Sequence, residues 1–190
     1  MYHVSDDKRA KISAEMIYSG LIECLKEKSI DELTVTEIAQ RAGVGRATFY
    51  RNFDSPIDVL HMKCNACFEE VIGGYIDSYE KGGNTRGSLL LYYFEYWIRH
   101  SELLEALSVV NRMDIFSECH FKHSGKITSL LRPGTNITSE EYIYFMSLRT
   151  GITIGILSAW IKTGKQKSAD ELVALLVKML DESMADEVLL

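Results

Sequence analysis

The sequence predicts an all-α protein of about nine helices. Apolar side chains recur at helical spacing along nearly the whole chain, and the alternation of polar and apolar residues that is typical of strands is almost absent. The 190 residues are 46% hydrophobic and 25% charged. These values indicate a globular protein with a sizeable core and exclude a disordered or low-complexity chain.

The first part of the chain contains four predicted helices, two of which have recognisable start signals. Thr34 and Glu37 have the spacing of a capping box, in which each side chain satisfies a backbone N–H group at the start of a helix. Ser55 and Pro56 form another start signal, because serine is a good N-cap and proline suits the first helical position. The expected helices span residues 6–28, Thr34 to Gly43, 46–52 and Pro56 to Tyr79.

The remainder of the chain continues in mostly longer helices. The apolar periodicity predicts them at about 86–99, 102–110, 113–131, 139–164 and 169–185. Long helices therefore dominate the part of the chain that follows Phe53.

The most informative segment is Thr34–Phe53, which reads TVTEIAQRAGVGRATFYRNF. It contains two helices of about two turns each, joined by a tight turn in which Gly43 permits a positive φ. Phe49 and Phe53 are four residues apart and therefore face the shared core together. The residues left facing outward on the second helix are Arg46, Ala47, Thr48, Tyr50 and Arg51.

That outward surface suits DNA. A helix whose first residues enter the major groove presents side chains to base edges, while hydroxyl and cationic groups beside it hold phosphates. Arginine suits guanine edges or the backbone, and threonine suits a thymine methyl group or a phosphate. The expected DNA contacts are Thr36, Arg46, Ala47, Thr48, Tyr50 and Arg51.

The net charge at first argues against a nucleic-acid partner. The chain has 21 Lys+Arg against 27 Asp+Glu, a formal charge of −6. The excess of acidic residues lies entirely after Phe53, whereas Arg41, Arg46 and Arg51 form a locally basic edge. Phosphates respond to charge within about 10 Å, so the acidic average does not exclude DNA.

The segment from Thr34 to Phe53 closely resembles the helix-turn-helix of TetR-family (tetracycline-repressor-like) transcriptional regulators. Nine positions match the family's pattern, namely Thr34, Ile38, Ala39, Ala42, Gly43, Val44, Thr48, Tyr50 and Phe53. Two positions depart from it: Gly45 stands where the family often has a capping serine, and Pro56 stands where many members have a phosphate-binding lysine.

The resemblance implies two domains: an N-terminal three-helix helix-turn-helix DNA-binding domain, residues 1–54, and a C-terminal helical bundle for effector binding and dimerisation, residues 55–190. It also implies a homodimer that binds a double-stranded operator, usually as a ligand-responsive repressor, and no enzymatic activity. The family's dimer interface is a four-helix bundle made by the last two long helices. The corresponding residues are Ile143, Leu148, Gly151, Ile152, Gly155, Ile156, Leu172, Leu175, Leu176 and Met179.

Aromatic residues in the second domain are candidates for an effector pocket. Drug-sized pockets are lined by aromatic side chains with a few hydroxyl groups. The candidates are Tyr93, Trp97, Phe116, Tyr142 and Phe145. Core packing is the alternative for each of them, and control by a protein partner is the alternative to a small molecule.

Metal or thiol sensing is a further, weaker alternative. His61, Cys64 and Cys67 lie three residues apart on one helix, a step that drifts by about 60° each time, so the three side chains diverge. We therefore expect buried cysteines and no metal or other cofactor. Catalytic motifs are absent, the N-terminal sequence is polar rather than signal-like, and no uninterrupted apolar run reaches transmembrane length. These features predict a cytoplasmic regulator with no membrane partner.

Overall fold

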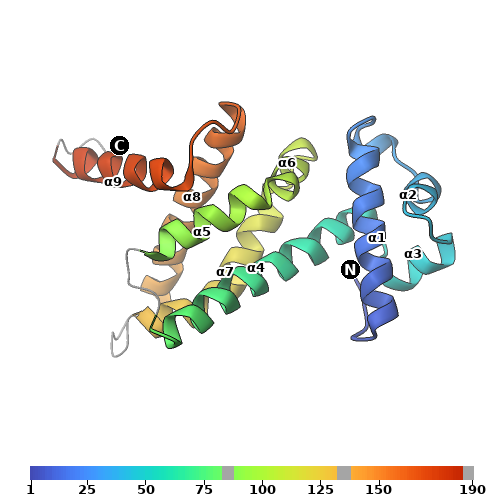
Figure 1. Ribbon diagram of the computed structural model, residues 1–190, viewed down its shortest axis with the longest axis horizontal. Helices are drawn as coiled ribbons and strands as arrows, with labels where there is room; N and C mark the ends of the chain where they lie inside the picture. Colours follow the sequence, from blue (N-terminus) through green and yellow to red (C-terminus); the bar gives the residue numbers. More distant parts are fainter. Residues whose placement is uncertain (83–87, 132–137, 186–190) are drawn as a thin grey trace. The chain divides into compact units, whose positions relative to one another are not determined.

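The computed structural model describes residues 1–82, 88–131 and 138–185, and these residues form α-helices joined by short loops (Figure 1). The all-α prediction is confirmed. The helices are α1 (Lys8–Leu25), α2 (Val35–Arg41), α3 (Arg46–Asn52), α4 (Pro56–Glu80), α5 (Ser88–Arg99), α6 (Ser101–Val109), α7 (Met113–Leu131), α8 (Ser139–Lys162) and α9 (Ala169–Ala185), with one short 3-10 helix, η1 (Ile30–Glu32).

Two helices end earlier than the sequence predicts. The first helix stops at Leu25, and η1 occupies part of the connection that follows. The eighth ends at Lys162, because Gly164 adopts a positive φ of 81°. The predicted start of the fifth helix, at residue 86, lies outside the described residues.

The chain forms two compact units. The first comprises Met1–Cys67 and Glu105–Cys119, and the second comprises Phe68–Leu104 and His120–Leu190. Helix α4 contributes residues to both. The predicted boundary between the DNA-binding and effector domains, at residue 54, stays a prediction.

In the first unit, α1 packs against both α2 and α3 (Figure 1). Ile17, Leu21, Ile38 and Phe49 are completely or almost completely buried in this small core. Gly20 lies at the crossing of α1 and α2, where an added Cβ would stand only 2.8 Å from the Cβ of Ala42. The crossing therefore requires glycine at position 20.

In the second unit, the core is aromatic. Phe68 packs against Trp97 with ring centroids 5.0 Å apart, and Tyr93 lies 6.1 Å from the same indole. This core also contains two buried polar side chains, His120 and Thr150. They satisfy each other through a hydrogen bond of 2.7 Å between His120 Nδ1 and Thr150 Oγ1. Burial lowers the pKa of His120 to about 4, so its imidazole is neutral at pH 7.

Candidate nucleic-acid interface

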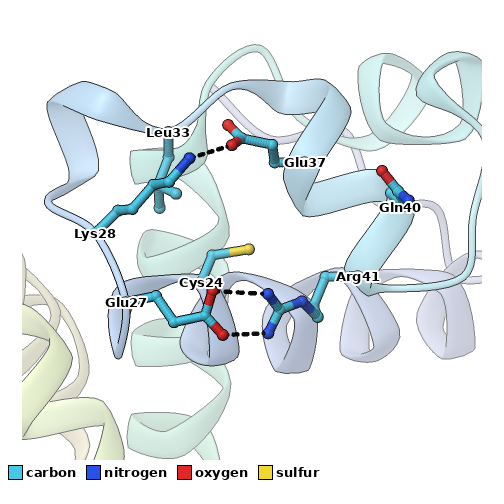
Figure 2. Close-up of a pocket in the computed structure, with 7 residues that line it drawn as sticks. All are labelled: Cys24, Glu27, Lys28, Leu33, Glu37, Gln40 and Arg41. Carbon is cyan, nitrogen blue, oxygen red and sulfur yellow. Dashed lines mark hydrogen bonds and ion pairs between the residues drawn. The ribbon is translucent and has the colours of Figure 1, made fainter.

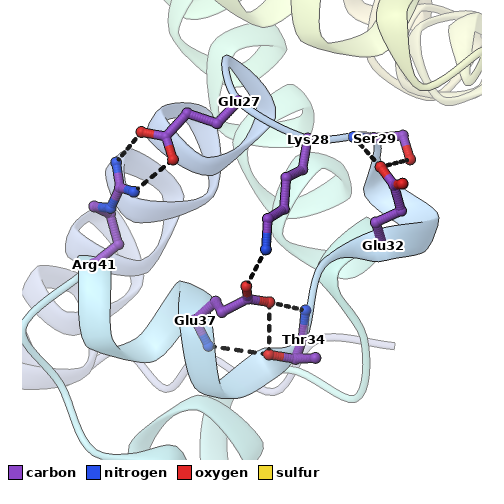
Figure 3. Close-up of polar contacts among 7 residues, drawn as sticks. All are labelled: Glu27, Lys28, Ser29, Glu32, Thr34, Glu37 and Arg41. Carbon is purple, nitrogen blue, oxygen red and sulfur yellow. Dashed lines mark hydrogen bonds and ion pairs between the residues drawn. The ribbon is translucent and has the colours of Figure 1, made fainter.

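The start of α2 is fixed by the capping box that the sequence predicts. The Glu37 N–H donates to Thr34 Oγ1 at 3.2 Å, and the Thr34 N–H donates to Glu37 Oε2 at 2.9 Å (Figure 3). Lys28 also donates to Glu37. Lys28 first, and then Thr34, lower the pKa of Glu37 to about 2. The carboxylate is therefore charged throughout the physiological range.

The turn between α2 and α3 has the conformation expected of a helix-turn-helix. Gly43 adopts a φ of 67°, a left-handed conformation that glycine reaches without strain. Gly45 is the N-cap of α3 and provides no side-chain cap. The cap is thus weaker than the serine it replaces in the family pattern.

The face of α3 is oriented as its spacing predicts. Phe49 and Phe53 are fully buried with ring centroids 5.8 Å apart, whereas half of the Tyr50 surface is exposed. Arg46, Ala47 and Arg51 are exposed, Thr48 is half-buried, and Thr36 is exposed on the first turn of α2. The six residues are thus placed on accessible surface. Their contacts with DNA stay a prediction.

The expected basic edge is wrong at Arg41, because this residue is paired with a carboxylate. Its guanidinium donates two hydrogen bonds of 2.9 Å to the two carboxylate oxygens of Glu27 (Figure 3). Glu27 is distant from Arg41 in the sequence but neutralises its charge in the fold, so the edge is less basic than predicted. The basic surface of the helix-turn-helix is therefore concentrated on α3, at Arg46 and Arg51.

A crevice of about 420 Å³ lies between the Arg41–Glu27 ion pair and the Lys28–Glu37 ion pair (Figure 2). Its lining is mainly polar and comes from α1, α2 and the connection between them. The residues are Cys24, Glu27, Lys28, Leu33, Glu37, Gln40 and Arg41. Burial raises the pKa of the Cys24 thiol, so the thiol stays protonated at pH 7.

All four cysteines are buried, as expected. A hydrogen bond with Cys119, together with burial, raises the pKa of Cys64 well above its ordinary value. The buried thiols act as packing groups. Within residues 1–82, 88–131 and 138–185, no three His, Cys, Asp or Glu side chains are arranged to hold a metal ion.

The proposed effector residues divide between the two units. Phe116 is buried in the first unit, while Tyr93 and Trp97 are buried in the second. Tyr142 and Phe145 are half-buried in the second unit, where the Arg149 guanidinium lies 5.5 Å from the Phe145 ring centroid. Burial of Tyr93, Trp97 and Phe116 is compatible with the core packing named as their alternative, and a role of any of the five in an effector pocket stays a prediction.

A hollow in the second unit is lined by residues that sequence reasoning missed. It has a volume of about 500 Å³ and is bounded by Glu69, Ile72, Gly73, Ile76, Asp77 and His123. Five of these six lie along one side of α4, at spacings of three or four residues. That periodicity marks a helix face, but it does not distinguish a face lining a hollow from one buried in a core.

The dimer candidates are more exposed on α8 than on α9. Ile143 and Leu148 are exposed, as are Gly151 and Gly155, while Ile152 and Ile156 are half-buried. On α9, Leu172 and Leu176 are buried, Leu175 is half-buried, and Met179 is exposed beside Val177 and Leu180. Because α9 packs on α5, Leu172 and Leu176 face the interior of the unit. Of the four residues predicted on α9, Met179 is therefore the most accessible, and the dimer interface itself stays a prediction.

Helix α8 is also unusually apolar for a surface helix. Among the described residues, only Glu140–Lys162 is long and apolar enough to cross a membrane by length and composition, with a mean hydropathy of 1.2 and 22% of the window buried. One such helix is weak evidence for a membrane span.

The first residues of the chain form a contact that the sequence did not reveal. Tyr2 forms an isolated antiparallel bridge with Phe53, at the corner between α3 and α4. A segment this short has no periodicity, so no sequence signal identified it.

Two solved structures resemble the whole chain. The first is Lin0861 from Listeria innocua, with 16% identity, 94% of each chain covered and a TM-score of 0.77. The second is a TetR transcriptional regulator from Streptococcus agalactiae 2603V, with 17% identity, 90% of this chain and 96% of that chain covered, and a TM-score of 0.61. At these identities the likeness shows the fold. No curated protein matches the chain.

An all-α fold with an exposed helix-turn-helix is typical of one class of protein, the helical DNA-binding transcriptional regulators. Residues 17–56 match the family described as bacterial regulatory proteins, tetR family. This match identifies the N-terminal part of the chain as a TetR-family DNA-binding domain.

Proposed function

We propose that this TetR-family regulator is a homodimeric, ligand-responsive repressor in the cytoplasm, with no enzymatic activity. The observation that carries the proposal is the exposed face of α3. It combines two arginines, a half-exposed tyrosine and a threonine on a helix whose opposite face is buried. This combination suits both base edges and phosphates in a major groove.

The exposed apolar face of α8 supports the homodimer. Ile143, Tyr144 and Leu148 are all more than half exposed, and Gly151 and Gly155 offer a region of close approach. A single short recognition helix reads few base pairs, so two-fold symmetry gives useful specificity. The proposed interface is the pairing of this face with the same face of a second copy.

The hollow on α4 supports a small-molecule effector. Its volume is within the usual range of ligand sites, about 300–1,000 Å³. Helix α4 has residues in both units, so a ligand on Ile72 and Ile76 acts on the helix that begins directly after the helix-turn-helix. In the proposed mechanism, the ligand changes the distance between the two recognition helices. A hundredfold loss of DNA affinity requires about 2.7 kcal/mol of coupling.

A gel-shift experiment tests the proposal. The probe is the DNA fragment upstream of the protein's own gene, at two salt concentrations, with a scrambled fragment of the same length as control. We expect a specific complex with the upstream fragment that weakens as salt rises. The absence of a specific complex at both salt concentrations would contradict the proposal.

A further inference from the structure

The first three residues of the chain are paired with the corner that joins α3 to α4. Tyr2 and Phe53 form the antiparallel bridge. On one side of it, the His3 N–H donates to the Asn52 carbonyl oxygen at 2.8 Å. On the other side, the Asp54 N–H donates to the Met1 carbonyl oxygen at 3.2 Å. The segment Met1–His3, here called the strap, is thus held by backbone bonds on both sides of Phe53.

The corner is the C-terminal end of the recognition helix. A helix of only seven residues is marginal by itself, and its last carbonyl groups have no partners within the helix. The strap provides one of the missing donors, to Asn52. The Asn52 side chain is 2% exposed and donates to the Thr48 carbonyl oxygen at 2.7 Å. The end of α3 is therefore fixed from inside by Asn52 and Phe53, and from outside by the strap.

The strap also contacts a carboxylate next to the proposed DNA surface. His3 Nε2 lies 3.0 Å from Asp54 Oδ1 in a hydrogen bond between two exposed side chains. His3 is the largest cause that lowers the pKa of Asp54, so this carboxylate is charged at pH 7. The negative charge of Asp54, three residues after Arg51, would repel DNA phosphates. The hydrogen bond with His3 offsets part of that repulsion.

We propose that the strap positions the recognition helix on operator DNA, so that specific affinity depends on a segment outside the helix-turn-helix. Arg51, Asn52 and Phe53 are consecutive, and holding the last two therefore fixes the backbone from which the Arg51 side chain extends. The strap acts through α3 and is a positioning element. The inference rests on the proposed role of α3.

The test compares His3→Pro with His3→Ala. Proline has no N–H group to donate to Asn52, and it keeps the preceding residue extended, as Tyr2 is in the bridge. Alanine retains the N–H group and removes only the imidazole. Fluorescence anisotropy gives the Kd of each full-length variant for the upstream fragment and for the scrambled fragment, and thermal melts report the stability of the same samples.

For His3→Pro we expect affinity for the upstream fragment to fall about tenfold while affinity for the scrambled fragment changes less than about twofold. His3→Ala should stay within about threefold of the unmodified protein on both fragments. A His3→Pro variant that binds the upstream fragment normally would overturn the inference. So would equal losses on both fragments that follow a fall in melting temperature, because that result indicates a purely structural role.

Hydrogen exchange by NMR tests the strap without any substitution. In the unmodified protein, the His3 amide should exchange more slowly than that of Val4, and more slowly again in the DNA complex. If the His3 amide exchanges as fast as an unprotected amide, the strap itself is overturned, even if the protein binds DNA. Failure of the unmodified protein to select the upstream fragment would instead overturn the proposed function, and the DNA role of the strap with it.

Discussion

Arg41 and Glu27 are joined by two hydrogen bonds of 2.9 Å, one to each carboxylate oxygen. This fork-to-fork geometry connects the end of α2 to the residue two positions beyond α1. The guanidinium of Arg41 is consequently engaged by protein, while Arg46 and Arg51 remain exposed on α3. The structure thus distinguishes an arginine that is paired within the protein from two that are exposed on α3 and that we propose contact DNA.

Arg46→Ala and Arg41→Ala should affect the salt dependence of DNA binding differently. Removing a phosphate contact reduces the slope of log affinity against log salt by about one. We expect that reduction for Arg46→Ala. For Arg41→Ala we expect an unchanged slope and a lower melting temperature, because its partner is Glu27. Anisotropy titrations at four salt concentrations give both slopes, and a reduced slope for Arg41→Ala alone would contradict this assignment.

Gly20→Ala should destabilise the protein. The added Cβ would stand 2.8 Å from both Cβ and N of Ala42 and 2.9 Å from the carbonyl oxygen of Ile38, so backbone has to move. Overpacking of this kind costs about 1–3 kcal/mol of unfolding free energy.

Gly73→Ala is the matched control, because an added Cβ there meets nothing within 4 Å and Gly73 also lies inside a helix. Alanine should stabilise α4 by about 0.5–1 kcal/mol. Urea unfolding measures the free energy of unfolding of both variants. Equal stabilisation by the two substitutions would show that α1 and α2 do not cross closely at Gly20.

Glu37→Gln should change how stability depends on pH. The pKa of Glu37 is lowered from 4.5 to about 2 in the folded protein, so its charged form stabilises the fold above pH 4.5. That stabilisation is lost as the pH falls towards 2. The difference in unfolding midpoint between Glu37→Gln and the unmodified protein should therefore be larger at pH 7 than at pH 3.

Urea unfolding at the two pH values measures this difference. Glu69→Gln, at an exposed glutamate on α4, is the control and should show a small difference at both. A Glu37→Gln difference that grows on acidification would contradict the arrangement around Lys28 and Thr34.

Local signals predicted the helix-turn-helix well, because its determinants are close in sequence. The capping box of Thr34 and Glu37 and the positive φ of Gly43 follow from spacing and residue type alone. The pairing of Arg41 with Glu27 and of Tyr2 with Phe53 depends on tertiary packing, and periodicity contains no information about it. The same holds for Phe116, since an aromatic residue on an apolar helix face has the same pattern in a core and in a pocket.

Leu148→Glu should produce a monomer. The Leu148 side chain is 62% exposed, so the single chain should remain folded, while a charge at the centre of the proposed interface opposes association. DNA affinity should fall at least about tenfold, because a monomer contacts one half-site. Analytical ultracentrifugation measures the mass.

Val109→Glu is the control for Leu148→Glu. Val109 is 67% exposed on α6 and is not among the residues proposed for the interface, so this variant should remain dimeric. A dimeric Leu148→Glu variant would exclude this face of α8, and a monomeric unmodified protein would exclude the homodimer.

The central claim is that the exposed face of α3 reads DNA. It is tested most directly by the affinity of Arg51→Ala for the fragment upstream of the gene, with melting temperature measured on the same sample. Loss of a base or phosphate contact should cost about 1–3 kcal/mol of binding free energy. The account predicts that loss with an unchanged melting temperature. Unchanged DNA affinity, or a collapse of thermal stability, would contradict it.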